Sequence, residues 1–494
     1  MRNYSEFSKR KARTTRLIFA GLLLLGAVLR LIDLTDPPLD FHPTRQLRGM
    51  LVSRDIYYHL LPNADAEIQA QATAFRNQLG LYEPPIFESL VAWTYLWAGG
   101  ESIVIPRVYN TLFWLIGGIA LYALARRLAS DEAGLISLAF YLVLPFSVEA
   151  SRSFQPDPLM TSLFILGFYF LYRWVMEKKW KWSLLAGLVL GFAALVKVVI
   201  AFYVAPLAIA AVLLVYGKKF WKSPQVWAMA FLVVVPAYLY YIVGTGNNSA
   251  EFFTNRTLEM TQLILTTKFY LRWMRLVGSL FGLPFVYLSF LGVLLLPSRG
   301  RTLLLSLWFG YFLYGIALPF QIYTHSYYHI QLIPLVALGL APIAKLLFAQ
   351  ALGQERFWRG VFLTAILVGI AYPAWVARSV LLSEDFHHEA LVWENIADAI
   401  PADRDTIALT QDYGYRLMVF GWKKVSLWSP STTMMAVRGK EIDAQAEFDR
   451  LTEGEDFFLI TAFRQLDKQP ELKKILENYP VAAEGDGYVI YDLR

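Results

Sequence analysis

Apolar runs of about 20 residues recur through most of this chain, and they constrain its fold more than any other feature. A helix needs about 20 mostly apolar residues to cross a bilayer, and a helix satisfies its own backbone hydrogen bonds there. The pattern predicts a polytopic α-helical membrane protein with about eleven transmembrane helices. The candidate spans are residues 15–33, 106–125, 132–150, 157–176, 182–198, 199–217, 226–244, 275–296, 302–320, 329–349 and 358–380.

The composition supports a membrane protein and excludes several other classes. Of the 494 residues, 56% are hydrophobic and 17% are charged, and the mean hydropathy is +0.43. Soluble domains are nearer roughly 45–50% apolar and 25% charged. The net charge of +6 comes largely from short loops between apolar runs, so it indicates topology and a bilayer partner, and no nucleic acid. The absence of cysteine excludes disulfides, thiolate catalysis and cysteine metal sites.

The positions of the basic residues predict which side of the membrane each loop occupies. The tail before the first span is strongly basic, so we expect a cytoplasmic N-terminus and an uncleaved signal anchor in an inner (plasma) membrane. The segment 85–99 is short, carries Glu88 and follows two prolines, so we interpret it as an interfacial or re-entrant helix. With 85–99 not crossing, every short basic loop lies inside and the C-terminus lies outside.

Two regions differ from the membrane pattern. Residues 1–380 form the predicted membrane module, with a long external loop over 34–105, and residues 381–494 alternate strand and helix patterns. The second region predicts a small extracytoplasmic α/β domain. It has no glycine-rich phosphate loop and no nucleophile elbow, so we expect it to support the module or bind an acceptor. Its expected strands are 406–411, 424–428, 456–462 and 487–493, with helices over 441–451 and 470–479.

Ionisable residues cluster where the predicted topology places the outer face. A charged group at membrane depth costs about 2.5–3.5 kcal/mol on insertion scales, so such groups are functional candidates. Carboxylates suit a general base, and cations suit a phosphate leaving group. A lipid-phosphate donor needs both groups beside an apolar groove. The candidates are Asp40, His42, Arg45, Glu83, Arg152, Asp157, Lys197, Arg272, His325, Tyr327 and Tyr328.

Each candidate also has a structural interpretation. Asp40 suits a turn, Asp157 suits the N-cap of the span that begins there, and Lys197 suits a side chain that extends to the membrane interface. His325 and His329 have the i, i+4 spacing of zinc ligands, but no third ligand is evident, so interfacial hydrogen bonding is the alternative.

The order of several motifs resembles a known family. An acidic loop follows the first span, then "YEPPIF" precedes a short helix, and "SRSFQPDP", "GFAALVK" and "HSYYHIQLIP" follow in turn. This order resembles the type C glycosyltransferases of the protein O-mannosyltransferase and lipid A aminoarabinose transferase group (families 39 and 83). The resemblance covers about residues 10–350. It implies a polyprenyl-phosphate sugar donor, a lipid, glycan or protein acceptor, and inverting transfer at the outer face.

The resemblance also implies residue roles. Asp40 corresponds to the acidic residue of the first loop and would act as general base, while Asp157 corresponds to the second acidic residue. Lys197 and the His325-x-Tyr327-Tyr328 element match further family positions. The chain departs from the aminoarabinose enzymes where Glu83 replaces a lysine before Pro-Pro.

That departure leaves open which cation contacts the phosphate. Arg45 and Arg152 are substitutes, and with His42 and Arg272 they complete the predicted substrate-binding set. The anionic leaving group needs no acid, and no cofactor is required, although the carboxylates could bind a divalent metal.

Two other functions compete with sugar transfer. A flippase or transporter of lipid-linked sugars would typically show internal repeats and a midplane site. The chain shows no repeat, and its charged residues gather at one face. A scaffold that presents the C-terminal domain would not need the acidic and basic residues at the span ends. The sequence therefore favours a glycosyltransferase.

Overall fold

The computed structural model describes residues 2–80, 82–245, 260–401, 404–428 and 443–494. The chain divides into two compact units. The first comprises residues 1–34, 81–87 and 104–383, and the second comprises residues 35–80, 88–103 and 384–494. The long first loop therefore groups with the C-terminal segment, and the remaining helices form a unit of their own.

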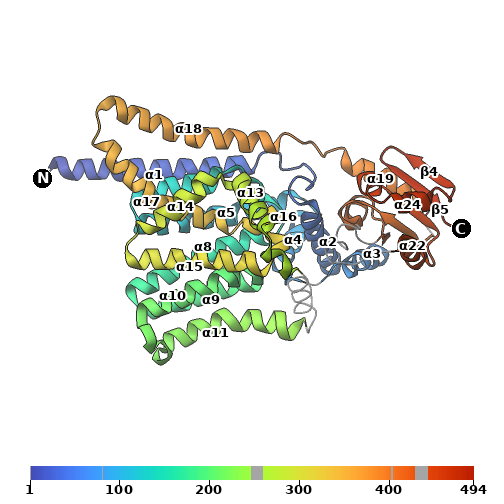
Figure 1. Cartoon of the computed structure of the whole chain (residues 1–494), viewed down its shortest axis with the longest axis horizontal. Coiled ribbons are helices and arrows are strands. Elements are labelled where there is room, and N and C mark those ends of the chain that lie inside the picture. The colour runs from blue at the N-terminus through green and yellow to red at the C-terminus, as the bar shows by residue number, and fades with distance from the viewer. Residues whose placement is uncertain (1, 81, 246–259, 402–403, 429–442) are drawn as a thin grey trace. The chain divides into compact units, whose positions relative to one another are not determined.

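The first unit is a bundle of helices, several of which lie side by side in Figure 1. Its members agree with the apolar runs of the sequence, because each predicted span overlaps a helix or a pair of helices. The main helices are α1 (Arg2–Arg30), α5 (Val104–Leu128), α6 (Asp131–Val143), α7 (Pro145–Arg152), α8 (Asp157–Glu177), α9 (Trp180–Val196), α10 (Ala201–Tyr216), α11 (Pro224–Tyr238), α13 (Thr267–Phe281), α14 (Leu283–Leu294), α15 (Ser298–Ala317), α16 (Pro319–Thr324), α17 (Leu332–Leu352) and α18 (Arg356–Leu381).

The helices confirm a multi-pass membrane protein without fixing the number of crossings. Among the described residues, seven helices are long and apolar enough to span a bilayer, or up to nine if each of two bent pairs is one span. Helix α9 is apolar but shorter. The count of eleven and the side on which each terminus lies stay predictions.

Two predicted spans are broken by local backbone chemistry. Helices α6 and α7 meet at 62° where Pro145 starts α7, because proline cannot continue the preceding helix. Helices α13 and α14 meet at 93° at Gly282, whose φ of 76° ends the α-helical path. The single helices predicted over 132–150 and 275–296 are therefore bent pairs.

Glycines let helices of this unit approach closely. A Cβ on Gly292 of α14 would lie 2.0 Å from the carbonyl oxygen of Gly339 in α17. A Cβ on Gly310 of α15 would lie 2.4 Å from the carbonyl oxygen of Phe202 in α10. Small residues at helix contacts increase dispersion contacts between backbones, which is typical of membrane bundles.

The second unit contains a five-stranded sheet. The strand order is β2-β1-β3-β5-β4, with β2, β1 and β3 parallel and with β5 antiparallel to both β3 and β4. The sheet has a buried apolar cluster with residues of α19 (Glu389–Ala399), α20 (Tyr415–Phe420) and β1. A second cluster contains residues of α22 (Ala444–Thr452) and α24 (Pro470–Leu476). The strands are β1 (Thr406–Leu409), β2 (Ser426–Leu427), β3 (Phe457–Ile460), β4 (Val481–Gly485) and β5 (Tyr488–Asp492).

The helices of the first loop pack against the C-terminal segment inside this unit. These are α2 (Pro43–Leu60), α3 (Ala66–Asn77) and the part of α4 (Ile86–Ala98) that belongs to the unit. An apolar cluster joins α2 and α3 to Met418 and Val419 of α20 (Tyr415–Phe420). Arg54 of α2 donates to the carbonyls of both residues at 2.8 and 3.0 Å, so the loop and the segment share one core.

The predicted C-terminal sheet is confirmed, with differences at its edges. Helices α22 (Ala444–Thr452) and α24 (Pro470–Leu476) and four strands occur where the sequence predicts them, apart from residues 441–442, which lie outside the described residues. Strand β4 and helices α19 (Glu389–Ala399) and α20 were not predicted. The position of this sheet outside the membrane stays a prediction.

Candidate active site

Three predicted residues form a buried charged cluster in the first unit. Lys197 Nζ lies 2.9 Å from both carboxylate oxygens of Asp157 and 3.5 Å from Glu83 Oε1. The side chains of Lys197, Asp157 and Glu83 are only 7%, 3% and 13% exposed. Two carboxylates around one ammonium give the three side chains a formal net charge of −1. In a poorly solvated site, such groups interact more strongly than in water.

The local backbone explains how Asp157 and Lys197 meet. Asp157 is the first residue of α8, while Pro156 takes the N-cap position, so the Asp157 carboxylate pairs with Lys197 instead of capping the helix. Lys197 follows the last residue of α9, where φ of −157° and ψ of 112° interrupt the helix before a short 3₁₀ turn. Its side chain is buried and does not extend to the surface, contrary to the interfacial alternative.

Aromatic side chains of the His-x-Tyr-Tyr element lie beside the lysine. The ring centroid of Tyr327 lies 5.4 Å from Lys197 Nζ, in cation–π range. Tyr328 stacks on Tyr314 with the ring centroids 5.8 Å apart. His325 contacts the rings of Tyr327 and Tyr328, and its Nδ1 lies 2.7 Å from Thr324 Oγ1. The structure therefore joins four of the predicted elements: Glu83, Asp157, Lys197 and the 325–328 turn.

The sequence singled out His329 but missed Tyr311 and Trp273, which support this turn with it. His329 is fully buried, with Nε2 2.7 Å from the carbonyl of Ile322 and Nδ1 2.9 Å from the Tyr311 hydroxyl. The carbonyl can only accept, so Nε2 carries the proton and Nδ1 accepts from Tyr311. Tyr311 in turn accepts from Trp273 Nε1 at 2.7 Å. Both ring nitrogens of His329 thus have protein partners, which contradicts the zinc alternative for the two histidines.

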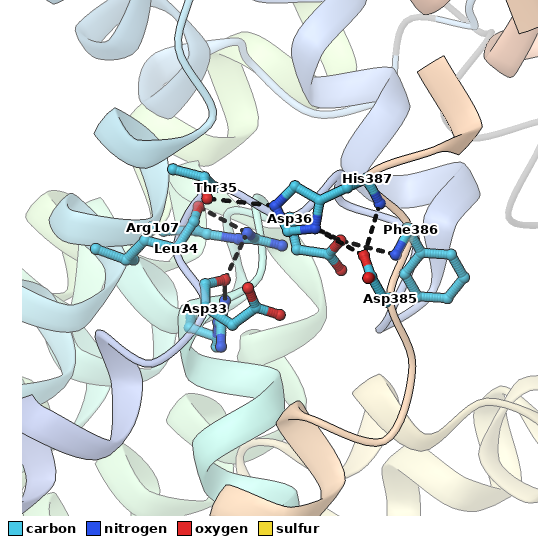
Figure 2. A network of polar contacts seen from close by, with 9 residues as sticks. Asp33, Leu34, Thr35, Asp36, Arg107, Asp385, Phe386 and His387 are labelled. Atoms are coloured by element: carbon cyan, nitrogen blue, oxygen red, sulfur yellow. Dashed lines mark hydrogen bonds and ion pairs between the residues drawn. The ribbon is translucent and has the colours of Figure 1, made fainter. Parts of the chain in front are cut away.

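Two buried arginines hold the chain that follows α1. Arg152 donates to the carbonyls of Ile32 and Asp33, at 2.6 Å each. Arg107 donates to the carbonyls of Asp33 and Leu34 (Figure 2). Arg152 therefore stabilises the turn after α1, and its predicted contact with phosphate stays a prediction.

The remaining basic candidate of this unit is Arg272, which lies on α13. Arg272 is exposed, and its guanidinium lies 5.5 Å from the ring centroid of Tyr323. Arg256, a further basic residue that precedes it in the sequence, lies outside the described residues.

Asp40 belongs to the second unit, where its carboxylate is exposed but oriented. Its Oδ1 accepts hydrogen bonds from Phe41 N at 2.8 Å and from Gln46 Nε2 at 2.9 Å. Gln46 is buried in the first turn of α2 and also donates to the Phe41 carbonyl at 2.9 Å. The sequence did not predict this role of Gln46, which fixes the direction of the carboxylate.

His42 and Arg45 lie on either side of the start of α2. His42 occupies the N-cap in the left-handed region, with φ of 50°, and its ring packs edge-on to Phe41. Arg45 is half-buried in the first helical turn. Asp40, His42 and Arg45 thus all lie in the turn that leads into α2 or in its first helical turn, and their predicted roles stay predictions.

Figure 2 also shows polar contacts between Asp36 and the segment that follows α18. The buried Asp36 carboxylate accepts from Phe386 N at 2.8 Å and lies 3.2 Å from His387 Nδ1. Hydrogen bonds from the backbone and ring of His387 lower the pKa of Asp385 below its ordinary value. The ligand atoms of Asp36, Asp385 and His387 lie within 4.8 Å of one another. These contacts tie the first loop to the C-terminal segment, and the metal requirement stays untested.

Two apolar grooves of the first unit are lined by residues that closely follow Lys197 in the chain. One, of about 750 Å³, lies between α10 and α15, and the other, of about 530 Å³, lies among α9, α10 and α11. Ala201 and Ala205 line both grooves, and Ala201 is four residues after Lys197. Nearly all lining side chains are apolar, so the grooves suit hydrocarbon chains.

Comparisons with known proteins agree with this architecture. Residues 83–241 match the family described as dolichyl-phosphate-mannose-protein mannosyltransferase. No curated relative matches the chain by sequence. The match includes Glu83, Asp157 and Lys197.

Solved structures extend the likeness to nearly the whole chain. ArnT from Cupriavidus metallidurans bound to undecaprenyl phosphate is 15% identical, with a TM-score of 0.59 over 96% of this chain and 97% of that one. The oligosaccharyltransferase AglB from Archaeoglobus fulgidus, in complex with an inhibitory peptide and a dolichol-phosphate, is 11% identical, with a TM-score of 0.55 over 98% of this chain and 74% of that one. The resemblance to type C glycosyltransferases is confirmed, and the structural likeness is one of fold.

Proposed function

We propose that this protein is an inverting membrane glycosyltransferase that moves a sugar from a polyprenyl-phosphate donor to an acceptor hydroxyl at the outer face of the plasma membrane. The observation that carries the proposal is the buried Lys197–Asp157–Glu83 cluster, together with the two apolar grooves lined by α10, the helix that follows Lys197 in the chain. A polyprenyl-phosphate sugar combines an anionic group with a long apolar tail. A cation near the end of an apolar groove matches both parts.

Asp40 serves as the general base in this proposal. It is exposed, and hydrogen bonds from Gln46 and from the Phe41 amide to Oδ1 orient its carboxylate, which we assign to the acceptor hydroxyl. A base must lie within about 2.6–3.2 Å of the proton it removes. His42 and Arg45, which flank the same turn, orient the acceptor or the sugar.

The lipid phosphate is the leaving group. The acceptor oxygen forms a bond to the anomeric carbon, the bond from that carbon to the phosphate oxygen breaks, and the electron pair leaves with the phosphate. The acceptor proton moves to Asp40. Because the phosphate departs as a stable anion, no acid has to protonate it, unlike in hydrolysis of an ordinary glycoside. A single displacement of this kind inverts the anomeric configuration.

Cations must balance the phosphate charge. Lys197 already faces two carboxylates, so its ammonium alone does not neutralise the departing phosphate, which gains a second negative charge as the bond to the sugar breaks. We assign Lys197 and Arg272 to phosphate oxygens, and His325, Tyr327 and Tyr328 to hydrogen bonds or ring contacts with the sugar phosphate. Arg152 has a supporting role, because its guanidinium holds the carbonyls of Ile32 and Asp33.

The carrier and acceptor classes follow from the similar proteins. ArnT was solved with undecaprenyl phosphate and AglB with a dolichol-phosphate and a peptide. A polyprenyl-phosphate carrier is therefore the donor class we propose, with a lipid, glycan or protein hydroxyl as acceptor. A flippase for the same lipid would not need an oriented exposed carboxylate such as Asp40, so we favour transfer.

The decisive experiment incubates the purified protein with a panel of polyprenyl-phosphate sugars and measures release of polyprenyl phosphate. Transfer predicts that one or more donors release the lipid phosphate and that an acceptor accelerates the release. A flippase predicts movement of intact donor across a vesicle bilayer without release. No release from any donor, with or without membrane extracts as acceptor source, would contradict the proposal.

A further inference from the structure

A strained turn in the C-terminal segment lies against the start of α2. Residues 411–414 follow β1, the central strand of the parallel part of the sheet. Asp412 and Tyr413 adopt left-handed conformations with φ of 49° and 57°, and Gly414 follows with φ of 75°. Residues other than glycine rarely adopt this conformation, and it persists only where the surrounding contacts hold it.

Contacts on the sheet side hold the turn in place. Gln411 donates through Nε2 to the Thr461 carbonyl at 3.0 Å, and its Oε1 accepts from the Thr461 hydroxyl. Arg416 Nε donates to Asp412 Oδ2 at 2.7 Å, and Arg416 also pairs with Glu389 of α19 at 3.2 Å. The turn is thus held by Thr461, which follows β3, and through Arg416 by Glu389 of α19.

The other carboxylate oxygen of Asp412 contacts the first loop. Asp412 Oδ1 accepts a hydrogen bond from Thr44 Oγ1 at 2.7 Å. Thr44 is the second residue of α2, and two residues later Gln46 orients the Asp40 carboxylate. Asp412 therefore holds the same helical turn that directs Asp40.

The first-loop turn is itself held in an uncommon conformation. His42, between Asp40 and Thr44, has φ of 50°, and its carbonyl accepts from Arg45 N at 2.9 Å. Two left-handed turns, one in each segment, are thus joined by the hydrogen bond from Thr44 to the Asp412 carboxylate. The Asp412 carboxylate is only 13% exposed, and hydrogen bonds to ionised groups are about twice as strong as neutral ones.

We propose that Asp412 is a positioning residue, through which the C-terminal segment holds the Asp40 turn in the conformation used for sugar transfer. This inference rests on the proposed function only for its effect on turnover. It assigns the C-terminal sheet a specific task, which is to fix the direction of the first-loop carboxylate through Thr44 and α2.

The test compares variants that remove the hydrogen bond with variants that keep it. Thr44→Val removes the donor at nearly constant volume, and Asp412→Gly removes the acceptor while permitting the left-handed backbone. Thr44→Ser keeps the donor, and Asp412→Asn keeps an acceptor oxygen for Thr44 while it gives up the acceptor for Arg416 Nε. The matched control is Thr73→Val, because Thr73 Oγ1 donates to Asp55 Oδ1 at 3.0 Å elsewhere in the same unit.

Two readouts separate positioning from a general loss of structure. In the full-length protein, Thr44→Val and Asp412→Gly should each speed amide hydrogen exchange over residues 38–46 and lower kcat roughly 10- to 100-fold, with the KM for donor unchanged. Thr44→Ser and Asp412→Asn should stay within about threefold of the wild type, as should Thr73→Val. The kcat of the double variant Thr44→Val/Asp412→Gly should be no lower than that of the more impaired single variant, because both substitutions remove the same hydrogen bond.

Unchanged exchange over residues 38–46 in both variants, or faster exchange with normal kcat, would overturn the proposal. If the wild type transfers no sugar from any donor, the proposed function fails. The exchange measurement would then still decide whether Asp412 holds the first-loop turn.

Discussion

Lys197 Nζ lies at the same distance, 2.9 Å, from both carboxylate oxygens of Asp157, and Glu83 Oε1 lies farther away at 3.5 Å. The arrangement is asymmetric. Lys197 has two acidic partners, whereas Asp157 depends on one ammonium. Because these side chains are nearly inaccessible to water, removal of a partner exposes the remaining charge to a large desolvation penalty.

That asymmetry predicts unequal effects of two substitutions. Lys197→Met leaves two neighbouring carboxylates without their shared cation and should destabilise the protein by about 3–5 kcal/mol. Asp157→Asn leaves Lys197 paired with Glu83 and should cost roughly 1 kcal/mol. Thermal unfolding in detergent should therefore rank the wild type above Asp157→Asn, with Lys197→Met last. Equal unfolding temperatures for the two variants would contradict the claim that Lys197 is the shared cation of two carboxylates.

The hydroxyl of Tyr311 predicts a second stability effect. Tyr311→Phe removes the donor to His329 Nδ1 and the acceptor for Trp273, leaving buried polar atoms, so it should destabilise the protein by about 1–3 kcal/mol. Tyr203 is the matched control. Its buried hydroxyl has no hydrogen-bond partner in the described part of the chain, so Tyr203→Phe should be neutral or stabilising. Unfolding midpoints in denaturant measure the stability of both variants. An equal loss of stability in Tyr311→Phe and Tyr203→Phe would refute the hydrogen bonds assigned to the Tyr311 hydroxyl.

Close helix packing predicts a third pair of outcomes. A Cβ on Gly292 would meet the Gly339 carbonyl oxygen at 2.0 Å, so Gly292→Ala must separate α14 from α17 and should cost about 1–3 kcal/mol. A Cβ on Gly369 of α18 would meet no heavy atom within 4 Å among the described residues, so Gly369→Ala should be neutral or stabilising through helix propensity. The comparison is made by thermal unfolding at a fixed detergent concentration. A harmless Gly292→Ala would show that α14 and α17 do not pack this closely.

The sequence predicted the helical bundle because long apolar runs leave little alternative in a bilayer. It did not predict the bends, because each depends on a single residue such as Pro145 or Gly282. Strand β4 was missed since "VAAEG" has low strand propensity and is largely exposed at the sheet edge. The turn at Asp486-Gly487, where Gly487 has φ of 81°, is the hairpin signal that would have revealed it.

The sequence predicted the charged residues of the candidate site better than the residues that act through hydrogen bonds. Glu83, Asp157 and Lys197 are far apart in sequence, but unpaired charges at span ends are costly, and this predicted that they would gather. Gln46, His329 and Asp412 act through hydrogen bonds to residues that only the fold brings near. In Asp412-Tyr413-Gly414, aspartate and glycine both favour a left-handed turn, but nothing in the sequence links that turn to Thr44.

The most direct test of the central claim compares polyprenyl phosphate release by the wild type and by Asp40→Asn, with the active donor at saturation. The amide keeps an oxygen for Gln46 but cannot accept the acceptor proton as a carboxylate does. We predict that kcat falls at least about 100-fold while donor affinity stays within about threefold. Turnover by Asp40→Asn close to that of the wild type would contradict the account.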